Sequence, residues 1–357
     1  MDGRTRDIYE AEATAWAAKR HPGHLEAARD FGRSASGPSV DLGCGPGWYA
    51  GELAPPVIAL DGARSMLELS RVHAPAALRV QADLVALPFR RVALGAAWAR
   101  NSYVHLPRGA LPLALADLHR STRVGGTAVL SFFGGQGEGR RLFEDDDFPG
   151  RFFSLWEPEE VDDLVTGAGF TIDDVVLRSN ETGHRSIEVH ASRARTLPDY
   201  VAPDLALLLC GLNPSLRAAD AGVGFVTGSN RFWPAALAAG IVTRDRDPWH
   251  AARHDGVGFT DLVKRASVGA AELRPDEYRE GFARVERLAA WLTPAAVCFV
   301  GLSGWRAAVD AKATAGWQER TVGGRPAYVM PNPSGLNAHT TPADLERHLR
   351  AAALPAA

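Results

Sequence analysis

The stretch VDLGCGPG, residues 40–47, decides how the first half of the chain folds. Its glycines stand at the alternate positions Gly43, Gly45 and Gly47, after an apolar segment and before one with helical periodicity. Glycine has no Cβ, so such a loop can turn tightly between a strand and a helix and let its backbone approach a ligand closely. The loop by itself indicates either a ligand site or an ordinary tight turn.

Strand-like and helix-like segments alternate on both sides of this loop. Amphipathic segments predict helices, and short apolar runs predict buried strands. This alternation is typical of an α/β fold, a parallel sheet with helices on both faces. We expect helices at 8–19, directly after residue 47, at 66–73, at 111–121 and from 158 onward, and strands at the start of 38–47 and within 55–63, 78–89, 94–105, 127–133, 170–178 and 185–193.

Two acidic residues end the next two predicted strands. Asp61 follows the apolar run VIAL, 20 residues beyond Asp41, where a carboxylate can accept hydrogen bonds from both hydroxyls of a ribose. Asp83 ends the third strand. A glycine loop followed by two such acids favours a ligand that contains a nucleoside.

With these motifs, residues 1–193 resemble the class I S-adenosylmethionine-dependent methyltransferases. The segment Leu87-Pro88-Phe89 after Asp83 and the turn and strand RVGGTAVLSFF also resemble that family. A dinucleotide-binding dehydrogenase is the alternative, but its G-x-G-x-x-G pattern is not met, since residue 48 is Trp and residue 50 is Ala. The resemblance implies a Rossmann-like fold, S-adenosyl-L-methionine as cofactor, and a cofactor site made of Asp41, Gly43, Gly45, Gly47, Asp61 and Asp83.

The methyl acceptor is unknown from the sequence. The segment ARNSYVHL, residues 99–106, lacks the Asn/Asp-Pro-Pro-aromatic signature of methyltransferases that act on amino groups of DNA bases. A small molecule or a nucleoside is therefore the more natural acceptor. Tyr103 and His105 are candidates for contacting it, with packing as their alternative role, and an inactive scaffold is the alternative for the whole domain.

Periodicity is lost near residues 194–203 and then restarts. We therefore expect two domains, residues 1–195 and residues 203–353. The second again alternates strands and helices, which predicts another three-layer α/β domain with a central parallel sheet. Its predicted elements are strands within 205–211, 295–301 and 325–330 and helices at 231–240, 278–292 and 342–353.

Three motifs of the second domain resemble the mismatch-specific uracil/thymine-DNA glycosylases of the uracil-DNA glycosylase superfamily. They are CGLNPSL at 210–216, GFVTGSNRFW at 224–233 and NPSGLN at 332–337. The resemblance implies that Asn213 positions the catalytic water, that Phe225 stacks on an extruded base, and that backbone N–H groups near Leu212 and Phe225 bind its carbonyls. It further implies a wedge that enters the duplex, made of Gly335, Leu336 and Asn337.

The residues suit this chemistry. Cleavage of an N-glycosidic bond needs a positioned water and stabilisation of positive charge on the sugar. Asn213 offers a carbonyl to hold water and an amide to donate, although an Asn before a proline is also a common turn residue. Asp261 is a second catalytic candidate, with a helix start as its alternative role. Leu336 could instead pack on the core.

The motifs also depart from the family. Ser215 replaces a glycine, and Asn337-Ala338 replaces a Ser-Arg pair after Leu336, which puts recognition of the opposite guanine in doubt. Arg231 could contact a phosphate or form a structural ion pair. No lysine at the motif positions could form a Schiff base, so we expect a monofunctional glycosylase that needs no cofactor and leaves the strand intact.

Composition limits the remaining possibilities. Three distant cysteines exclude a disulfide framework, and the net charge of −3 gives no global sign of nucleic-acid binding. The run WHAARHD, 249–255, lacks the ligands of a zinc site, so we expect no metal and a surface insertion there. No apolar window of roughly 20 residues and no N-terminal signal segment are found, so we expect a cytoplasmic monomer without membrane contact.

The expected partners are therefore double-stranded DNA with uracil or a mismatched pyrimidine, and an unknown methyl acceptor. The alternative is a small-molecule or nucleoside methyltransferase whose C-terminal module binds nucleic acid without cleaving it.

Overall fold

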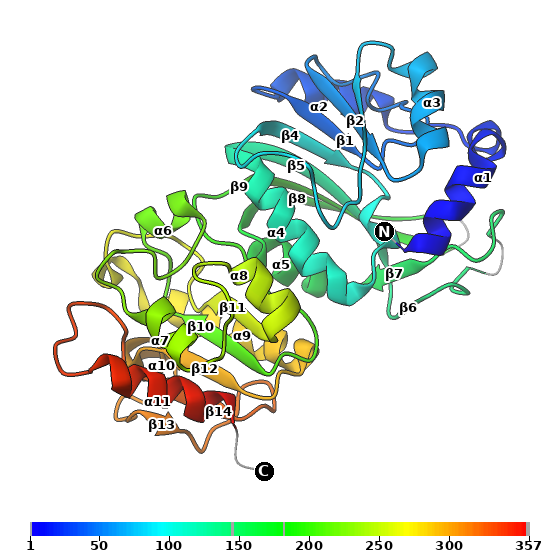
Figure 1. Ribbon diagram of the computed structural model, residues 1–357. Helices are drawn as coiled ribbons and strands as arrows, with labels where there is room; N and C mark the ends of the chain where they lie inside the picture. The colour runs from blue at the N-terminus through cyan, green and yellow to red at the C-terminus, as the bar shows by residue number, and fades with distance from the viewer. Residues whose placement is uncertain (1, 144–145, 181–182, 355–357) are drawn as a thin grey trace. The chain divides into compact units, whose positions relative to one another are not determined.

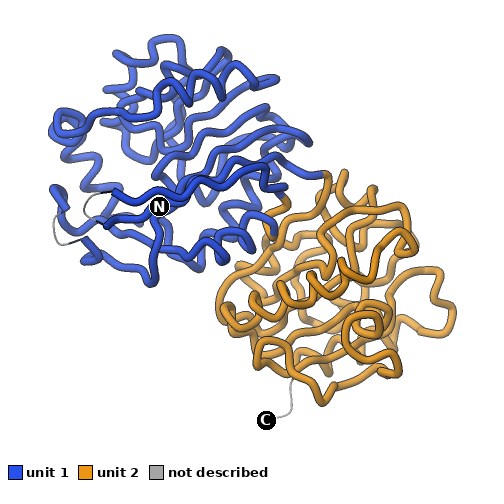
Figure 2. The backbone as a smooth tube through the Cα atoms, turned by 180° about the vertical axis from the view of Figure 1, so that it is seen from behind, with its two compact units in different colours: residues 1–166, 170–194 blue, residues 167–169, 195–357 orange. Residues whose placement is uncertain are grey.

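The computed structural model describes residues 2–143, 146–180 and 183–354. The chain divides into two compact units, one of residues 1–166 and 170–194, the other of residues 167–169 and 195–357 (Figure 2). Each unit has its own sheet with helices packed on it (Figure 1). No helix within the described ranges is long and apolar enough to cross a membrane.

In the first unit the strands β3, β2, β1, β4 and β5 run parallel in that order. β9 then pairs antiparallel with β5, and β8 pairs antiparallel with β9. Only residues 180–184 link β8 to β9, and a parallel return would need a much longer crossover. The strands are β1 (Ser39–Leu42), β2 (Val57–Asp61), β3 (Leu78–Gln81), β4 (Leu94–Ala99), β5 (Thr122–Gly134), β8 (Phe170–Ser179) and β9 (Arg185–Arg193), with the short β6 (Glu138–Gly139) and β7 (Phe153–Trp156) beside the end of β5.

The glycine loop leaves this sheet at the strand where its order reverses. β1 has β2 on one side and β4 on the other, and all four of its residues are buried. In open α/β sheets ligands bind outside the carboxyl end of the strand at such a switch point. The Rossmann-like fold predicted from the sequence is confirmed, with an antiparallel strand added to its parallel core.

The helices of this unit follow the predicted alternation with one exception. The segment after Gly47 forms successive turns rather than a helix, closed by bonds such as Gly51 N to Gly47 O at 3.0 Å. Only seven residues separate Gly47 from Pro55, and prolines cannot donate backbone hydrogen bonds to extend the turns. The helices are α1 (Gly3–Lys19), α2 (Leu25–Ser34), α3 (Arg64–His73), α4 (Leu111–Ser121) and α5 (Pro158–Gly167), with 3₁₀ turns η1 (Tyr103–His105) and η2 (Arg108–Ala110).

In the second unit the strands β11, β10, β12 and β14 run parallel in that order, and β13 pairs antiparallel with β14. Here β10 is the switch-point strand, because β11 and β12 lie on opposite sides of it. The carboxyl ends of β10 and β11 therefore open onto one edge. The strands are β10 (Leu207–Gly211), β11 (Val257–Asp261), β12 (Val297–Val300), β13 (Gly316–Trp317) and β14 (Ala327–Met330).

Helices cover both faces of this second sheet. Phe282 of α9 and Trp305 of α10 pack with Phe299 on one face, while Trp233 of α7 and Leu345 of α11 pack on the other. The three-layer α/β architecture expected from the sequence is thereby confirmed. The helical segments are α6 (Leu216–Ala221), α7 (Phe232–Ala238), α8 (Pro248–His250), the π-helical η3 (Ala251–Asp255), η4 (Ala270–Glu272), α9 (Pro275–Leu292), α10 (Leu302–Ala308) and α11 (Pro342–Ala353).

The run 249–255 is not the surface insertion that we expect from its sequence. Ala251 is buried and belongs to the core that contains Trp233. His250 Nε2 lies 3.0 Å from Thr243 Oγ1, and Asp255 accepts hydrogen bonds from the backbone N–H and the hydroxyl of the same threonine. His250 and Asp255 therefore hold this buried helical segment in place through their hydrogen bonds to Thr243.

Candidate functional site

The glycine loop of the first unit has the backbone that its composition predicts. Gly43, Gly45 and Gly47 all have positive φ, at 71°, 52° and 86°. A Cβ on Gly43 would lie 2.5 Å from Ser102 Cβ, and one on Gly47 would lie 2.7 Å from Ser70 Cβ. At Gly45 the nearest atom would be 3.9 Å away. The outer glycines thus permit close packing, whereas Gly45 leaves space above the loop.

Asp61 ties this loop to the next helix. Its Oδ2 accepts from Gly45 N at 2.9 Å and its Oδ1 from Ala63 N at 2.8 Å. Burial raises the pKa of this carboxyl to about 6, although its backbone hydrogen bonds oppose the shift. Asp61 also lines the cavity beside this loop.

The other acids lie elsewhere. Asp41 is buried inside β1, its Oδ2 accepts from Ala50 N at 2.9 Å, and burial raises its pKa to about 8. Asp83 is exposed, and its Oδ1 accepts from Val85 N at 3.2 Å. Of the six expected cofactor residues, Gly43, Gly45 and Asp61 line the cavity described next, whereas Asp41, Gly47 and Asp83 do not.

A cavity of about 1020 Å³ opens beside this loop. Its volume is at the upper end of the range for small-molecule sites, roughly 300–1,000 Å³. Aromatic side chains from distant segments form its inner wall, including Tyr9 and Trp16 of α1, Phe133, Phe143 and Phe153. We did not predict this wall, because its members meet only in the folded unit.

A buried polar chain crosses the cavity wall at His105. Its Nδ1 lies 2.7 Å from Phe152 O, which can only accept, so Nδ1 carries the proton and Nε2 accepts from Tyr9 Oη at 2.8 Å. Arg151 donates to the same Tyr9 oxygen at 2.8 Å. Burial lowers the pKa of His105 to about 4, so the imidazole is neutral. Tyr103, the other candidate for contacting the methyl acceptor, is fully buried and does not line the cavity.

In the second unit, Asn213 and Asp261 follow neighbouring parallel strands. Gly211 of β10 is in register with Asp261 of β11. The pairing continues beyond the strands, with Leu262 N donating to Gly211 O at 2.8 Å and Val263 N to Leu212 O at 2.9 Å. The fold thus brings both catalytic candidates to the same sheet edge, and Leu212, half-buried, packs against the core there.

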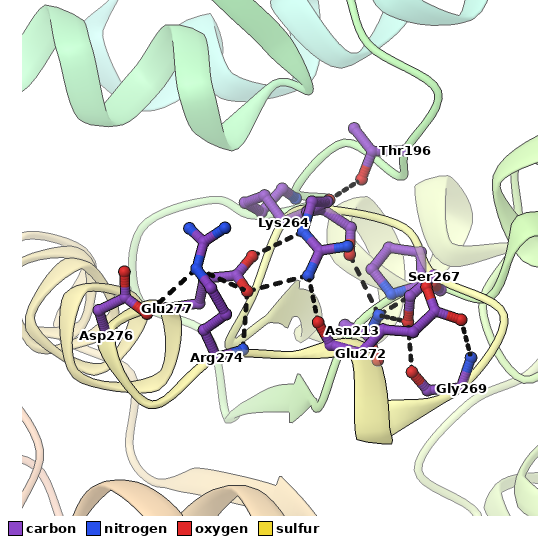
Figure 3. Close-up of polar contacts among 11 residues, drawn as sticks. Thr196, Asn213, Lys264, Ser267, Gly269, Glu272, Arg274, Asp276 and Glu277 are labelled. Carbon is purple, nitrogen blue, oxygen red and sulfur yellow. Dashed lines mark hydrogen bonds and ion pairs between the residues drawn. The ribbon is translucent and has the colours of Figure 1, made fainter.

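Asn213 is held through its amide nitrogen. Nδ2 donates to Ser267 Oγ at 2.8 Å and to Arg265 O at 3.1 Å (Figure 3). Among the described residues none donates to Oδ1, which remains an acceptor. In this arrangement protein acceptors occupy both hydrogens of the amide, so the oxygen is the side-chain atom left to face a substrate.

Asp261 and Phe225 meet beside Gly211. A Cβ at Gly211 would lie 2.4 Å from Asp261 Oδ1 and 3.7 Å from the Phe225 ring, so only glycine fits between them. Asp261 is the last residue of β11 and does not begin a helix, which removes that alternative. Burial raises the pKa of its carboxyl to about 6.

Phe225 adopts a backbone conformation unusual for a bulky residue. Its φ is +57°, in the left-handed region that disfavours side chains with a Cβ. The ring is half-buried and stacks on Phe232 with centroids 4.3 Å apart and planes at 26°. Backbone strain of this kind clusters at functional sites.

The expected wedge forms a projecting loop. Leu336 is 97% exposed, so it does not pack on the core. A Cβ at Gly335 would lie 2.6 Å from Ser229 Cβ, so a larger residue would displace the neighbouring loop. Asn337 points inward, its Nδ2 donating to Asn332 O and Thr340 Oγ1, each at 2.9 Å.

Arg231 supports this loop through backbone carbonyls, and among the described residues it forms no ion pair. Its guanidinium donates to Ser334 O at 2.9 Å, to Asn337 O at 2.8 Å and to Thr340 O. The three acceptors are backbone carbonyls on either side of Leu336. Arg231 is therefore a brace of the projecting loop in this structure.

Within the described ranges, no group of three or more His, Cys, Asp or Glu side chains could hold a metal ion. His250 and His254 contact each other with ring centroids 4.6 Å apart and planes tilted by 34°, and His250 also hydrogen-bonds with Thr243.

Both units therefore place polar side chains outside the carboxyl ends of switch-point strands, as ligand-binding α/β domains do. Residues 198–353 match the family model described as the uracil DNA glycosylase superfamily, and residues 40–126 match one described as a methyltransferase domain. The chain thus carries a methyltransferase domain followed by a domain of the uracil DNA glycosylase superfamily.

Solved structures similar to the chain include three methyltransferases. An S-adenosylmethionine-dependent methyltransferase from Methanosarcina mazei is 16% identical over 45% of this chain and 94% of its own, with a TM-score of 0.41. One from Mesorhizobium loti is 19% identical over 48% and 97%, with a TM-score of 0.40. The 1,6-didemethyltoxoflavin-N1-methyltransferase of Burkholderia thailandensis, solved with S-adenosylhomocysteine, is 18% identical over 53% and 87%, with a TM-score of 0.43.

Proposed function

We propose that residues 203–353 form a monofunctional DNA glycosylase that flips uracil, thymine or another modified pyrimidine out of mismatched or damaged DNA and hydrolyses its glycosidic bond. The observation that carries this proposal is the orientation of the Asn213 side chain, whose nitrogen is bonded to protein acceptors while none of the described residues donates to its oxygen Oδ1. An acceptor at the carboxyl edge of the sheet suits a water that attacks C1′ of the sugar.

The neighbouring residues would bind the extruded base, stabilise charge on the sugar and fill the gap in the duplex. Phe225, already stacked on Phe232, offers its ring to the extruded base, and Asp261 beside it would counter positive charge on the sugar in its ionised form. Leu336 would fill the gap that the flipped nucleotide leaves in the duplex. Water is the nucleophile, so the products are a free base and an abasic site.

The loop also bears on mismatch preference. Asn337 stands where related sequences have a serine followed by arginine, and its amide is bonded within the loop. It is thus committed to holding Leu336 rather than to reading an opposite guanine. We propose that the enzyme discriminates weakly between G·U and A·U pairs.

We further propose that residues 1–195 transfer a methyl group from S-adenosyl-L-methionine to a small-molecule or nucleoside acceptor. The loop fits this cofactor, because a Cβ at Gly45 would meet no atom closer than the Trp16 ring at 3.9 Å, and the cavity is large enough for cofactor and acceptor together. Asp61 would bind the ribose hydroxyls, with Gly43 and Gly45 beside the methionine portion. The cofactor, when bound, supplies the electrophilic methyl group.

The experiment that tests the glycosylase uses labelled duplexes with G·U, A·U or G·T pairs, followed by alkaline cleavage at abasic sites. We expect uracil release by the wild type and a loss of about a hundredfold or more in Asn213→Ala, because misplacing a reacting group by about 1 Å can cost on that order. Asn180→Ala, in the other unit, is the matched control. Binding to every duplex without release from any would favour a non-cleaving binding module instead.

A further inference from the structure

We propose that Ser267 is a positioning residue of the glycosylase site, which, together with the backbone carbonyl of Arg265, fixes the Asn213 amide so that only Oδ1 faces the attacking water. The proposal rests on the glycosylase function proposed above. Ser267 lies outside all three sequence motifs, 54 residues beyond Asn213, so only the fold shows the contact.

The direction of the two hydrogen bonds is fixed by chemistry. Arg265 O is a carbonyl and can only accept, so the side-chain atom of Asn213 that faces it must be the nitrogen. Ser267 Oγ donates its one hydrogen to Gly269 O at 2.9 Å and can therefore only accept from Asn213. Each contact favours the same amide orientation. The Ser267 contact is the shortest of the three that Nδ2 makes, since Pro214 O also accepts from it at 3.3 Å.

The two partners are themselves anchored. Ser267 is only 3% exposed, and its backbone N–H donates to Pro214 O at 3.1 Å, next to Asn213 in the chain. Arg265 donates from Nε and Nη2 to the two carboxylate oxygens of Glu277, at 2.7 and 2.9 Å, and from Nη2 also to Glu272 O at 2.8 Å. The Arg265 contact lowers the pKa of Glu277 to about 2, so this pair stays charged at any working pH.

This frame predicts a specific consequence for an altered residue 267. Without the hydroxyl, Asn213 Nδ2 loses its shortest hydrogen bond and keeps only the longer contacts to Arg265 O and Pro214 O, so the amide is held less firmly. The acceptor oxygen would then spend less time facing the water. The binding of DNA, which depends on other surfaces, would be unaffected.

The test compares Ser267→Ala with the conservative Ser267→Thr and with Val268→Ala, a change of an exposed neighbour on the same loop. We measure the single-turnover rate of uracil release from a G·U duplex at saturating protein, and duplex affinity by fluorescence anisotropy. We expect about a tenfold slower release in Ser267→Ala, the size of one net hydrogen bond. Affinity should be unchanged, and the threonine and Val268 variants should release uracil at the wild-type rate.

A double variant separates positioning from a general structural role. If Ser267 acts only through Asn213, Ser267→Ala should slow the residual release no further when Asn213 is already alanine. An equal loss in both backgrounds, or failure of threonine to restore the rate, would overturn the proposal.

A second measurement does not depend on activity. The chain has six asparagines, so ¹⁵N-asparagine labelling gives few side-chain amide signals, and Asn213→Ala identifies the one of interest. That signal should exchange slowly with solvent in the wild type and in Val268→Ala, and rapidly in Ser267→Ala. Rapid exchange in the wild type would refute the orientation, whereas slow exchange in a protein that releases no base would refute the proposed function alone.

Discussion

Asp41 and Asp61 lie 20 residues apart on neighbouring strands. Both carboxyl groups are buried, but they have different hydrogen-bond partners. Asp61 holds two backbone N–H groups and lines the cavity, while Asp41 holds one and does not. Burial raises the pKa of Asp61 to about 6 and that of Asp41 to about 8. The rise is larger for Asp41 because fewer hydrogen bonds stabilise its charged form. One acid is suited to ligand binding and the other to structure.

The pKa of Asp61 predicts a pH dependence of cofactor binding. The carboxylate accepts ribose hydroxyls well and the neutral acid poorly, so affinity should fall as pH drops through about 6. We expect S-adenosylhomocysteine to bind about tenfold more weakly at pH 5 than at pH 8 by calorimetry, since one pH unit below the pKa leaves a tenth of the carboxylate. Asp61→Asn should bind weakly at both pH values, and an unchanged wild-type affinity would contradict the role of Asp61.

Asp41 predicts a pH dependence of stability with a definite sign. Its pKa is raised in the folded state, so its contribution to folding is present below the unfolded-state pKa and is lost as pH rises through about 8. Asparagine mimics the protonated form. Asp41→Asn should therefore be close to the wild type at pH 4 and exceed its free energy of unfolding at pH 9 by up to roughly 6 kcal/mol, because the pKa is raised from 3.8 to about 8 and each pKa unit is worth about 1.4 kcal/mol. Urea unfolding at both pH values measures this, and equal stability at pH 9 would count against the assignment.

The sequence motifs predict Asn213, Phe225 and Leu336 as site residues, because each can be identified from its residue type and its place within a short motif. They do not predict Ser267 or the contact between Tyr9 and His105, which are 96 residues apart. Such partners are set by how strands and helices pack, and no local periodicity encodes them.

At the scale of elements, the loop 332–340 is held as a unit. Three backbone carbonyls on it accept hydrogen bonds from Arg231, and Gly335 packs against Ser229. A loop that is already fixed in shape loses little conformational entropy when Leu336 enters DNA.

Arg231→Gln should loosen this loop. We expect uracil release from duplex DNA to slow by about tenfold or more, since several hydrogen bonds to a charged donor are lost. Release from single-stranded DNA, where no gap needs filling, should stay near the wild-type rate. The two substrates are compared under single-turnover conditions, with Leu336→Ala as the reference for a missing wedge. An equal loss on both would indicate damage to the catalytic pocket instead.

The elements themselves were largely predictable, and the exceptions have physical causes. The parallel strands follow from apolar runs between amphipathic segments. The antiparallel direction of β9 depends instead on the short link after β8, and hydrophobic periodicity does not indicate strand direction. The helix expected after Gly47 is wrong because the chain reaches Pro55 too soon. The run 249–255 looks polar, yet its alanines face the core.

At the scale of the molecule, each unit has its own sheet and its own buried clusters. Ala59 and Trp98 lie in a core of the first unit, and Phe299 and Trp233 lie in those of the second. A ligand that binds one folded unit raises the stability of that unit by mass action.

Calorimetric unfolding of the whole chain should therefore show two transitions, of which S-adenosylhomocysteine raises only one. At a ligand concentration a hundred times the dissociation constant, that unit should gain about 2.7 kcal/mol. Asp61→Ala should abolish the shift, whereas Asn213→Ala should retain it, because its site lies in the other unit. A single transition, or a shift of both, would show that the two units unfold together, and ligand binding to the methyltransferase domain would then stabilise the second unit as well.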